Sequence, residues 1–190
     1  MKRVMGFFMF LALLACSPEK PRFQSIDLTG ADYAMGFTLP DTHGQTRTLA
    51  DFKGKVVMVF FGYTQCPDFC PTTLSEMVQV KHDLGAQGEK MQAVFITLDP
   101  ERDKPELLTT YMANFDPSFV ALVPALEALP DLAKDFKIYY KKVESTTPTH
   151  YTLDHSAGTY IYDTEGRLRL YARYGLGASA LTADVQQLIN

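Results

Sequence analysis

The sequence lacks the features of several large functional classes. Its 190 residues hold 18 Lys or Arg against 22 Asp or Glu, so the formal net charge is −4 and the pI is near 5.5. Without an excess of positive charge, the chain has no electrostatic footprint for nucleic acid. It also has no internal repeat and no low-complexity tract. A hydrophobic content of 46% and a charged content of 21% fit one globular domain with a real core.

The apolar stretch at the N-terminus is too short to span a bilayer. It covers residues 4–14 behind a basic start, which is the form of a secretory signal. The Leu-Leu-Ala-Cys ending at Cys16 resembles a bacterial lipobox, and a polar segment follows it. We therefore expect a signal peptide over 1–15, a lipidated tether over 16–30 and one folded domain over 31–190. Acyl chains on Cys16 would hold that domain to a membrane surface in the periplasm of the bacterial envelope.

Cysteine is scarce, which limits the kinds of site that the thiols can form. With a lipid on Cys16, only Cys66 and Cys70 remain, four residues apart in "FFGYTQCPDFCPTTL" and each followed by proline. In an oxidising compartment such a pair tends to become a disulfide. A purely structural disulfide would add little stability, because the loop that it closes is so short. A structural zinc site needs four ligands, usually from two knuckles, and this chain has no second pair of cysteines. A redox couple and a soft-metal site are the alternatives that remain.

Hydrophobic patterning predicts an α/β fold. Continuous β-branched and aromatic runs at 55–61 and 91–98 are typical of strands buried on both faces. The other expected elements are a hairpin over 36–49, helices over 72–88, 104–115, 127–138 and 178–190, strands over 119–123 and 137–144, and a hairpin over 158–175 that turns at 163–166. This order is the thioredoxin-like plan with an N-terminal β-hairpin and a C-terminal hairpin insertion.

The cysteine loop lies where α/β folds place their sites, between a buried strand and a helix. Pro71 suits the first helical position, which puts Cys70 at or beside the N-cap. The free amides and the dipole of a helix start favour a thiolate there. We expect the sulfurs of Cys66 and Cys70 to be close together, semi-exposed and more acidic than free thiols.

Histidine decides between redox and metal chemistry. His43 lies in a hairpin turn and His82 on a helix beside charged residues, so both are expected to be solvated, while His150 in a polar loop is ambiguous. His155 stands immediately before a strand, in a loop that a thioredoxin-like layout packs against the cysteines. Two thiolates and one imidazole suit Cu(I), and added oxygen or water ligands would serve Cu(II).

Three segments resemble the signature blocks of the Sco/SenC family of copper-binding proteins. They are "GKVVMVFFGYTQCPDFCPTTL", "ITLDPERDKPELLTTYMANFDPSFVAL" and "DHSAGTYIYDTEGRL". The resemblance implies a thioredoxin-like fold with copper held by Cys66, Cys70 and His155. It also implies a metallochaperone, not an enzyme in the strict sense, that loads the dinuclear copper centre of cytochrome c oxidase or another copper protein.

Two features around these blocks extend or depart from the family pattern. "DPERD" at 99–103 matches a family motif, in which we expect Asp99 to cap the next turn and Arg102 to pair locally. Some relatives carry an acidic residue near the metal where this chain has Pro130, with Asp131 adjacent. Relatives are often held by a transmembrane helix, which the lipid on Cys16 would replace.

Two thiol functions compete with copper handling. A thiol–disulfide oxidoreductase would use Cys66 and Cys70, but three residues separate them where thioredoxins have two, and Ser156 stands near the usual cis-proline. A thiol peroxidase needs a Thr or Ser three residues before its cysteine. That position holds Tyr63 or Pro67 here, which disfavours a peroxidase.

Overall fold

The computed structural model describes residues 22–144 and 151–190. Cys16, with the signal peptide, the lipid and the first part of the tether, lies outside the described residues, as does His150.

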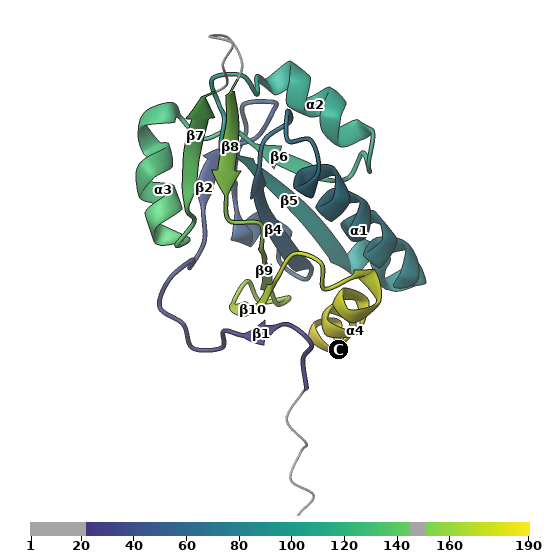
Figure 1. Ribbon diagram of the computed structural model, residues 1–190. Coiled ribbons are helices and arrows are strands. Elements are labelled where there is room, and N and C mark those ends of the chain that lie inside the picture. Colours follow the sequence, from purple (N-terminus) through teal and green to yellow (C-terminus); the bar gives the residue numbers. More distant parts are fainter. Residues whose placement is uncertain (1–21, 145–150) are drawn as a thin grey trace, which may run out of the picture.

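A six-stranded mixed sheet forms the centre of the domain, in the order β1-β10-β9-β4-β5-β6 (Figure 1). Its strands are β1 (Ile26–Asp27), β4 (Val56–Gly62), β5 (Met91–Thr97), β6 (Val120–Leu122), β9 (Thr159–Tyr162) and β10 (Leu168–Ala172). β4, β5 and β6 run parallel, whereas β9 pairs antiparallel with β4. The expected strands at 55–61, 91–98 and 119–123 and the hairpin turning at 163–166 are confirmed.

Helices cover both faces of this sheet, which explains why every residue of β4 and β5 is buried. The helices are α1 (Phe69–Asp83), α2 (Pro105–Ala113), α3 (Leu129–Asp135) and α4 (Ala178–Ile189). Figure 1 shows α1 and α4 together on one side and α3 on the other. The ring of Phe61 packs against Phe136 at the end of α3, with 4.9 Å between centroids. Phe60 points to the opposite face and contacts Phe95.

The helix after the cysteine loop begins earlier than the sequence suggested. α1 starts at Phe69 with Asp68 as its N-cap, and the amide of Thr72 donates to the carbonyl of Asp68. Cys70 therefore lies inside the first turn, two residues past the N-cap, rather than at or beside the N-cap as expected. Pro71 is tolerated at the third helical position because the N–H groups of the first turn have no intrahelical acceptor.

A separate two-stranded hairpin carries the histidine. Its strands are β7 (Tyr140–Glu144) and β8 (Tyr151–His155), and in Figure 1 it stands beside α3. β7 confirms the strand expected over 137–144. The segment 151–155 was expected to be loop, and this was wrong: Tyr151, Leu153 and His155 alternate with more exposed residues, as half-buried strands do.

The N-terminal hairpin is confirmed as β2 (Thr38–Pro40) and β3 (Thr46–Thr48). Three short 3-10 segments, at Leu49–Phe52, Gly85–Lys90 and Leu126–Ala128, join the larger elements. β1 pairs with β10, so part of the stretch 16–30 is packed on the sheet rather than free as a tether.

Gly158, just before β9, makes a close contact with Tyr171 of β10. A Cβ at Gly158 would lie 2.1 Å from the ring of Tyr171, so only glycine leaves room for that ring. We predict that Gly158→Ala lowers the free energy of unfolding by about 1–3 kcal/mol, the usual cost of overpacking. Urea denaturation measures this loss.

The double variant Gly158→Ala/Tyr171→Ala supplies the control. Because it removes the ring that the new methyl group would strike, it should be more stable than the sum of the two single changes allows. Purely additive losses would contradict the contact.

Candidate metal centre

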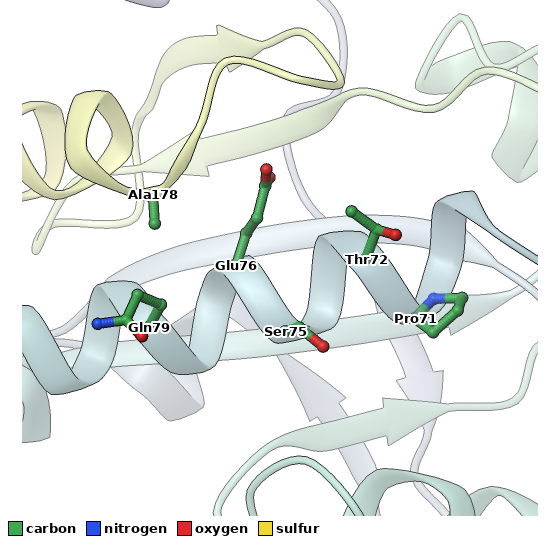
Figure 2. A pocket seen from close by; sticks show the side chains of 6 residues that line it. All are labelled: Pro71, Thr72, Ser75, Glu76, Gln79 and Ala178. Carbon is green, nitrogen blue, oxygen red and sulfur yellow. The ribbon is translucent and has the colours of Figure 1, made fainter.

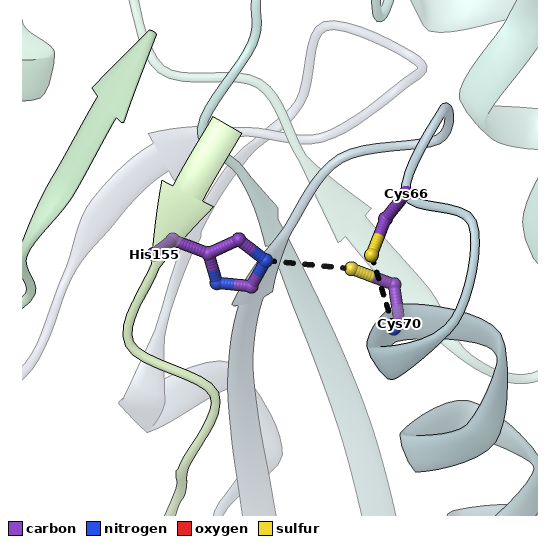
Figure 3. A group of neighbouring side chains, drawn as sticks. All are labelled: Cys66, Cys70 and His155. Carbon is purple, nitrogen blue, oxygen red and sulfur yellow. Dashed lines mark hydrogen bonds between the residues drawn. The ribbon is translucent and has the colours of Figure 1, made fainter. Parts of the chain in front are cut away.

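Three soft donor atoms converge at the carboxyl end of β4 (Figure 3). Cys66 comes from the loop after β4, Cys70 from the first turn of α1 and His155 from the end of β8. Their sulfurs and one imidazole nitrogen all lie within 4.8 Å of one another. The Nε2 atom of His155 is 3.8 Å from the sulfur of Cys70. The sequence predicted these three residues as a set, and the fold brings all three together.

Both sulfurs are more deeply buried than expected. Cys66 is 8% exposed and Cys70 is 0% exposed, and both are free thiols. The expectation of semi-exposed sulfurs is therefore wrong. For Cys70 the reason lies at Gly62, the last residue of β4, where a Cβ would come within 2.7 Å of the Cys70 sulfur. The missing side chain lets Cys70 pack directly against the strand.

The two thiols differ in acidity, contrary to the expectation that both would be acidic. A hydrogen bond from Cys70 does most to lower the pKa of Cys66, to about 3, and His155 and the amides of Asp68 and Cys70 add to it against the effect of burial. The amide of Cys70 lies 3.4 Å from the Cys66 sulfur. The start of α1 thus stabilises a thiolate on Cys66 rather than on Cys70.

Cys70 has the opposite shift. Its hydrogen bond to Cys66, its burial and the neighbouring thiolate charge all raise its pKa. In the metal-free protein the pair of cysteines therefore carries one proton, which is on Cys70.

The imidazole of His155 is oriented by its own surroundings. Its Nδ1 lies 2.9 Å from the carbonyl oxygen of Ser156. When its proton is on Nδ1, the ring can donate to that carbonyl, and Nε2 can offer its lone pair to a metal held by the sulfurs. The ring of Tyr63 meets the imidazole edge-on, with centroids 5.8 Å apart, and the Tyr63 hydroxyl accepts a hydrogen bond from the amide of Leu153. Neither Gly62 nor Tyr63 was singled out in the sequence as supporting the site.

The other residues considered in the sequence are not part of this group. His43 and His82 are exposed, as expected. Asp131 is exposed on α3 and is not among the three clustered donors. In the "DPERD" segment, Asp99 pairs with Arg102 and its carbonyl accepts the amide of Asp103 at 2.8 Å. The expected local pairing of Arg102 is therefore confirmed. The expected capping role of Asp99 is wrong, because its carboxylate binds Arg102 and the hydroxyl of Tyr151.

A shallow hollow of about 470 Å³ lies between α1 and the start of α4 (Figure 2). Its lining residues are Pro71, Thr72, Ser75, Glu76, Gln79 and Ala178. Glu76 is the one ionisable side chain among them, and partial burial raises its pKa. The hollow adds no thiol or imidazole to the site.

The donor set fits a soft metal ion. Thiolate and imidazole ligands select copper and zinc over hard cations, and two sulfurs with one nitrogen match three-coordinate Cu(I). Structural zinc would require a fourth protein ligand. The fold and this Cys-Cys-His group together define a thioredoxin-like protein with a candidate copper site.

Known proteins resemble this chain in sequence. A model of the SCO1/SenC family matches residues 27–190. The SCO2-like protein of Rickettsia conorii is 33% identical over 162 residues, which cover 84% of this chain and 79% of that protein. This chain therefore belongs to the SCO1/SenC family.

Solved structures of relatives confirm the thioredoxin-like fold. The copper-bound ScoI of Bradyrhizobium japonicum superposes with a TM-score of 0.72 at 35% identity, over 80% of this chain and 97% of that one. The apo Sco1 of Thermus thermophilus gives a TM-score of 0.76 at 35% identity, over 88% and 97% of the two chains.

The unequal acidity of the thiols predicts a distinctive reaction with iodoacetamide. Since the pKa of Cys66 is lowered to about 3, this thiol stays ionised from pH 5 to pH 8. We expect the reduced, copper-free protein to be alkylated once, at Cys66, at a rate that changes little over that range. Mass spectrometry of quenched time points gives both the site and the rate.

The variant Cys66→Ser is the control, and it should lose the fast reaction. An ordinary thiol has a pKa of about 8.5. Below that pH its rate would instead rise roughly tenfold for each unit by which the pH is raised. Such a slope in the native protein would contradict the lowered pKa.

Proposed function

We propose that this protein is a copper-binding metallochaperone of the bacterial envelope, which delivers copper to the dinuclear copper centre of cytochrome c oxidase. Cys66, Cys70 and His155 hold the ion in this proposal. The observation that carries it is the convergence of two sulfurs and one imidazole nitrogen within 4.8 Å.

Relatives support both halves of this proposal. The Bradyrhizobium japonicum relative, at 35% identity, was solved with copper bound. Another protein of the same fold is described as a member of the Sco family of cytochrome c oxidase assembly proteins. The copper-bearing subunit of the oxidase, or another copper protein, is the partner that this family suggests.

Copper loading follows from the protonation of the pair. Cys66 is already a thiolate, whereas Cys70 keeps its proton. Cu(I) would bind two thiolates and neutral His155, and one proton would leave Cys70 for solvent. Loading is therefore coupled to the release of one proton and requires both cysteines to be reduced.

The surface beside the ligands suits transfer to a partner. Cys66 is the less buried of the two cysteines, so an incoming thiolate reaches copper most directly from its side. Phe69, next to Cys70, is 46% exposed and stacks edge-on against Tyr174, which is 39% exposed, with 4.8 Å between centroids. This aromatic pair offers apolar contact area to a partner at the rim of the site.

A lipid on Cys16 would attach the domain to a membrane and leave it in the periplasm. The support for this is the lipobox-like motif after the secretory signal over residues 1–15. In the part of the chain that the structure describes, no helix is both long and apolar enough to cross a membrane.

Removal of the imidazole tests the copper site directly. We predict that His155→Ala lowers the affinity for Cu(I) more than about 100-fold, because the loss of an outer-sphere partner alone costs about 10–100-fold. The reduction potential of the Cys66–Cys70 couple should change little. Competition with a chromophoric Cu(I) chelator under anaerobic conditions measures the affinity.

The matched control is His82→Ala, since the side chain of His82 is 81% exposed on α1 and outside the group. It should bind Cu(I) like the unaltered protein. Equal affinity in His155→Ala and His82→Ala would remove His155 from the ligand set.

The second candidate is a thiol–disulfide oxidoreductase, which the thiolate on Cys66 favours. Cys66 would attack a partner disulfide and release one partner thiolate. Cys70 would then lose its proton and displace the second partner sulfur, which leaves a Cys66–Cys70 disulfide. The raised pKa of Cys70 opposes this second step.

A trapping experiment separates the two candidates. An oxidoreductase with the change Cys70→Ser should accumulate a mixed disulfide between Cys66 and its partner in cells, visible on non-reducing gels. Tight Cu(I) binding without any trapped partner favours the metallochaperone.

A further inference from the structure

The metal centre is assembled from two separate parts of the fold. The cysteine loop and α1 supply the sulfurs, and β8 supplies the imidazole from 85 residues away from Cys70. Metal affinity depends on a fixed spacing between the sulfurs and the imidazole. Residues that do not bind the metal must maintain that spacing. The segment 99–103, between β5 and α2, contacts both parts.

Arg102 bridges the two parts with one side chain. Its Nη1 donates to the carbonyl oxygen of Tyr151 at 2.9 Å and to Oε1 of Gln65 at 3.1 Å. Gln65 precedes Cys66 in the loop, while Tyr151 begins the strand that ends at His155. The guanidinium group also lies over the ring of Tyr151, 3.5 Å from its centroid.

Asp99 binds both Arg102 and Tyr151 and so holds them together. Its side chain is only 1% exposed and accepts a hydrogen bond from Nε of Arg102. It also accepts the hydroxyl of Tyr151 at 2.7 Å. Asp99, Arg102 and Tyr151 thus form a closed set in which the arginine, 17% exposed, is held by an ion pair and by a ring.

The cysteine loop has a second anchor that does not involve Arg102. Asp103 is fully buried and accepts the amide of Thr64 at 3.0 Å, and it also accepts the hydroxyls of Thr64 and Thr97. Without Arg102, the loop would still be tied to the end of β5. β8 would keep its pairing with β7 and the hydrogen bond from Leu153 to Tyr63. What is lost with Arg102 is the side chain that links Gln65 of the cysteine loop to the start of β8, so Arg102 constrains the distance between the two parts.

We propose that Arg102 is a positioning residue that sets the spacing between His155 and the two cysteines. The inference rests on the proposed copper site for its consequence, though not for its contacts. Lysine cannot replace it, because an ammonium group has no planar fork to stack on Tyr151 while donating to two oxygens and to Asp99. Both Arg102→Ala and Arg102→Lys should therefore loosen β8.

Arg169→Ala is the matched control. Arg169 is 22% exposed, similar to Arg102, and pairs with Asp163 at 3.3 Å. Its other contacts are with Thr29 and Phe23, and none of these residues belongs to the metal centre. It reports what the loss of a half-buried, paired arginine does to the fold in general.

The first readout needs no copper. In the reduced apo protein, we expect the amides of residues 151–155 to exchange with deuterium about tenfold faster in both Arg102 variants, equivalent to about 1.4 kcal/mol of local stability. The central strands and the Arg169→Ala protein should keep their protection. Since this readout concerns only the hold on β8, it stands even if the protein binds no copper.

The second readout concerns the ligand itself. The Arg102 variants should bind Cu(I) at least about tenfold more weakly. In the Cu(II)-loaded protein they should show weaker nitrogen hyperfine coupling, because His155 is no longer held against the sulfurs. The unaltered protein and Arg169→Ala should keep both properties. A failure of the unaltered protein to bind copper through nitrogen would overturn the proposed function instead.

Three outcomes would overturn the role of Arg102. The first is folded Arg102→Ala protein with native exchange at 151–155 and native nitrogen coupling. The second is full rescue by lysine, which would reduce the role to charge. The third is loss of folding in both Arg102→Ala and Arg102→Lys, which would make the arginine a general structural residue.

Discussion

The antiparallel pairing of β9 with β4 is the constraint on which the metal centre depends. Phe60 pairs with Thr159, so β9 begins where β4 ends. The cysteine loop leaves the sheet at that end, and the chain from His155 arrives there. A shift of one residue would turn the faces of β9 over and carry the histidine away from the sulfurs. All four residues of β9 are buried, so exchanging its two faces would disrupt packing on both sides of the sheet, which opposes such a shift.

The same edge of the sheet explains the chemistry of the sulfurs. Gly62 admits Cys70 against β4, and the start of α1 then directs its amides at Cys66. One thiol is kept protonated by burial and by its neighbour, while the other is held as a thiolate. The site thus carries one negative charge before a metal arrives. A second charge appears only when a cation binds and displaces the proton of Cys70.

Much of this could be predicted from the sequence, because strong patterns carry it. Continuous apolar runs predicted β4 and β5, and the turn at Asp163–Gly166 predicted the β9–β10 hairpin. The resemblance to the Sco/SenC family predicted Cys66, Cys70 and His155 as copper ligands, and the fold brings these three residues together. β8 was missed because a short, half-polar strand after a Thr/Pro-rich stretch has little local signal, and its pairing with β7 is tertiary information. The acidity and burial of the thiols depend on Gly62 and the exact start of α1, which spacing alone does not determine.

The central claim is that one copper ion binds to two sulfurs and one nitrogen. X-ray absorption at the copper edge, on residues 22–190 reduced and loaded with one equivalent of Cu(I), tests it most directly. The account predicts a three-coordinate ion with two sulfur neighbours and one imidazole nitrogen. Coordination by sulfur alone, or by oxygen and nitrogen without sulfur, would contradict it.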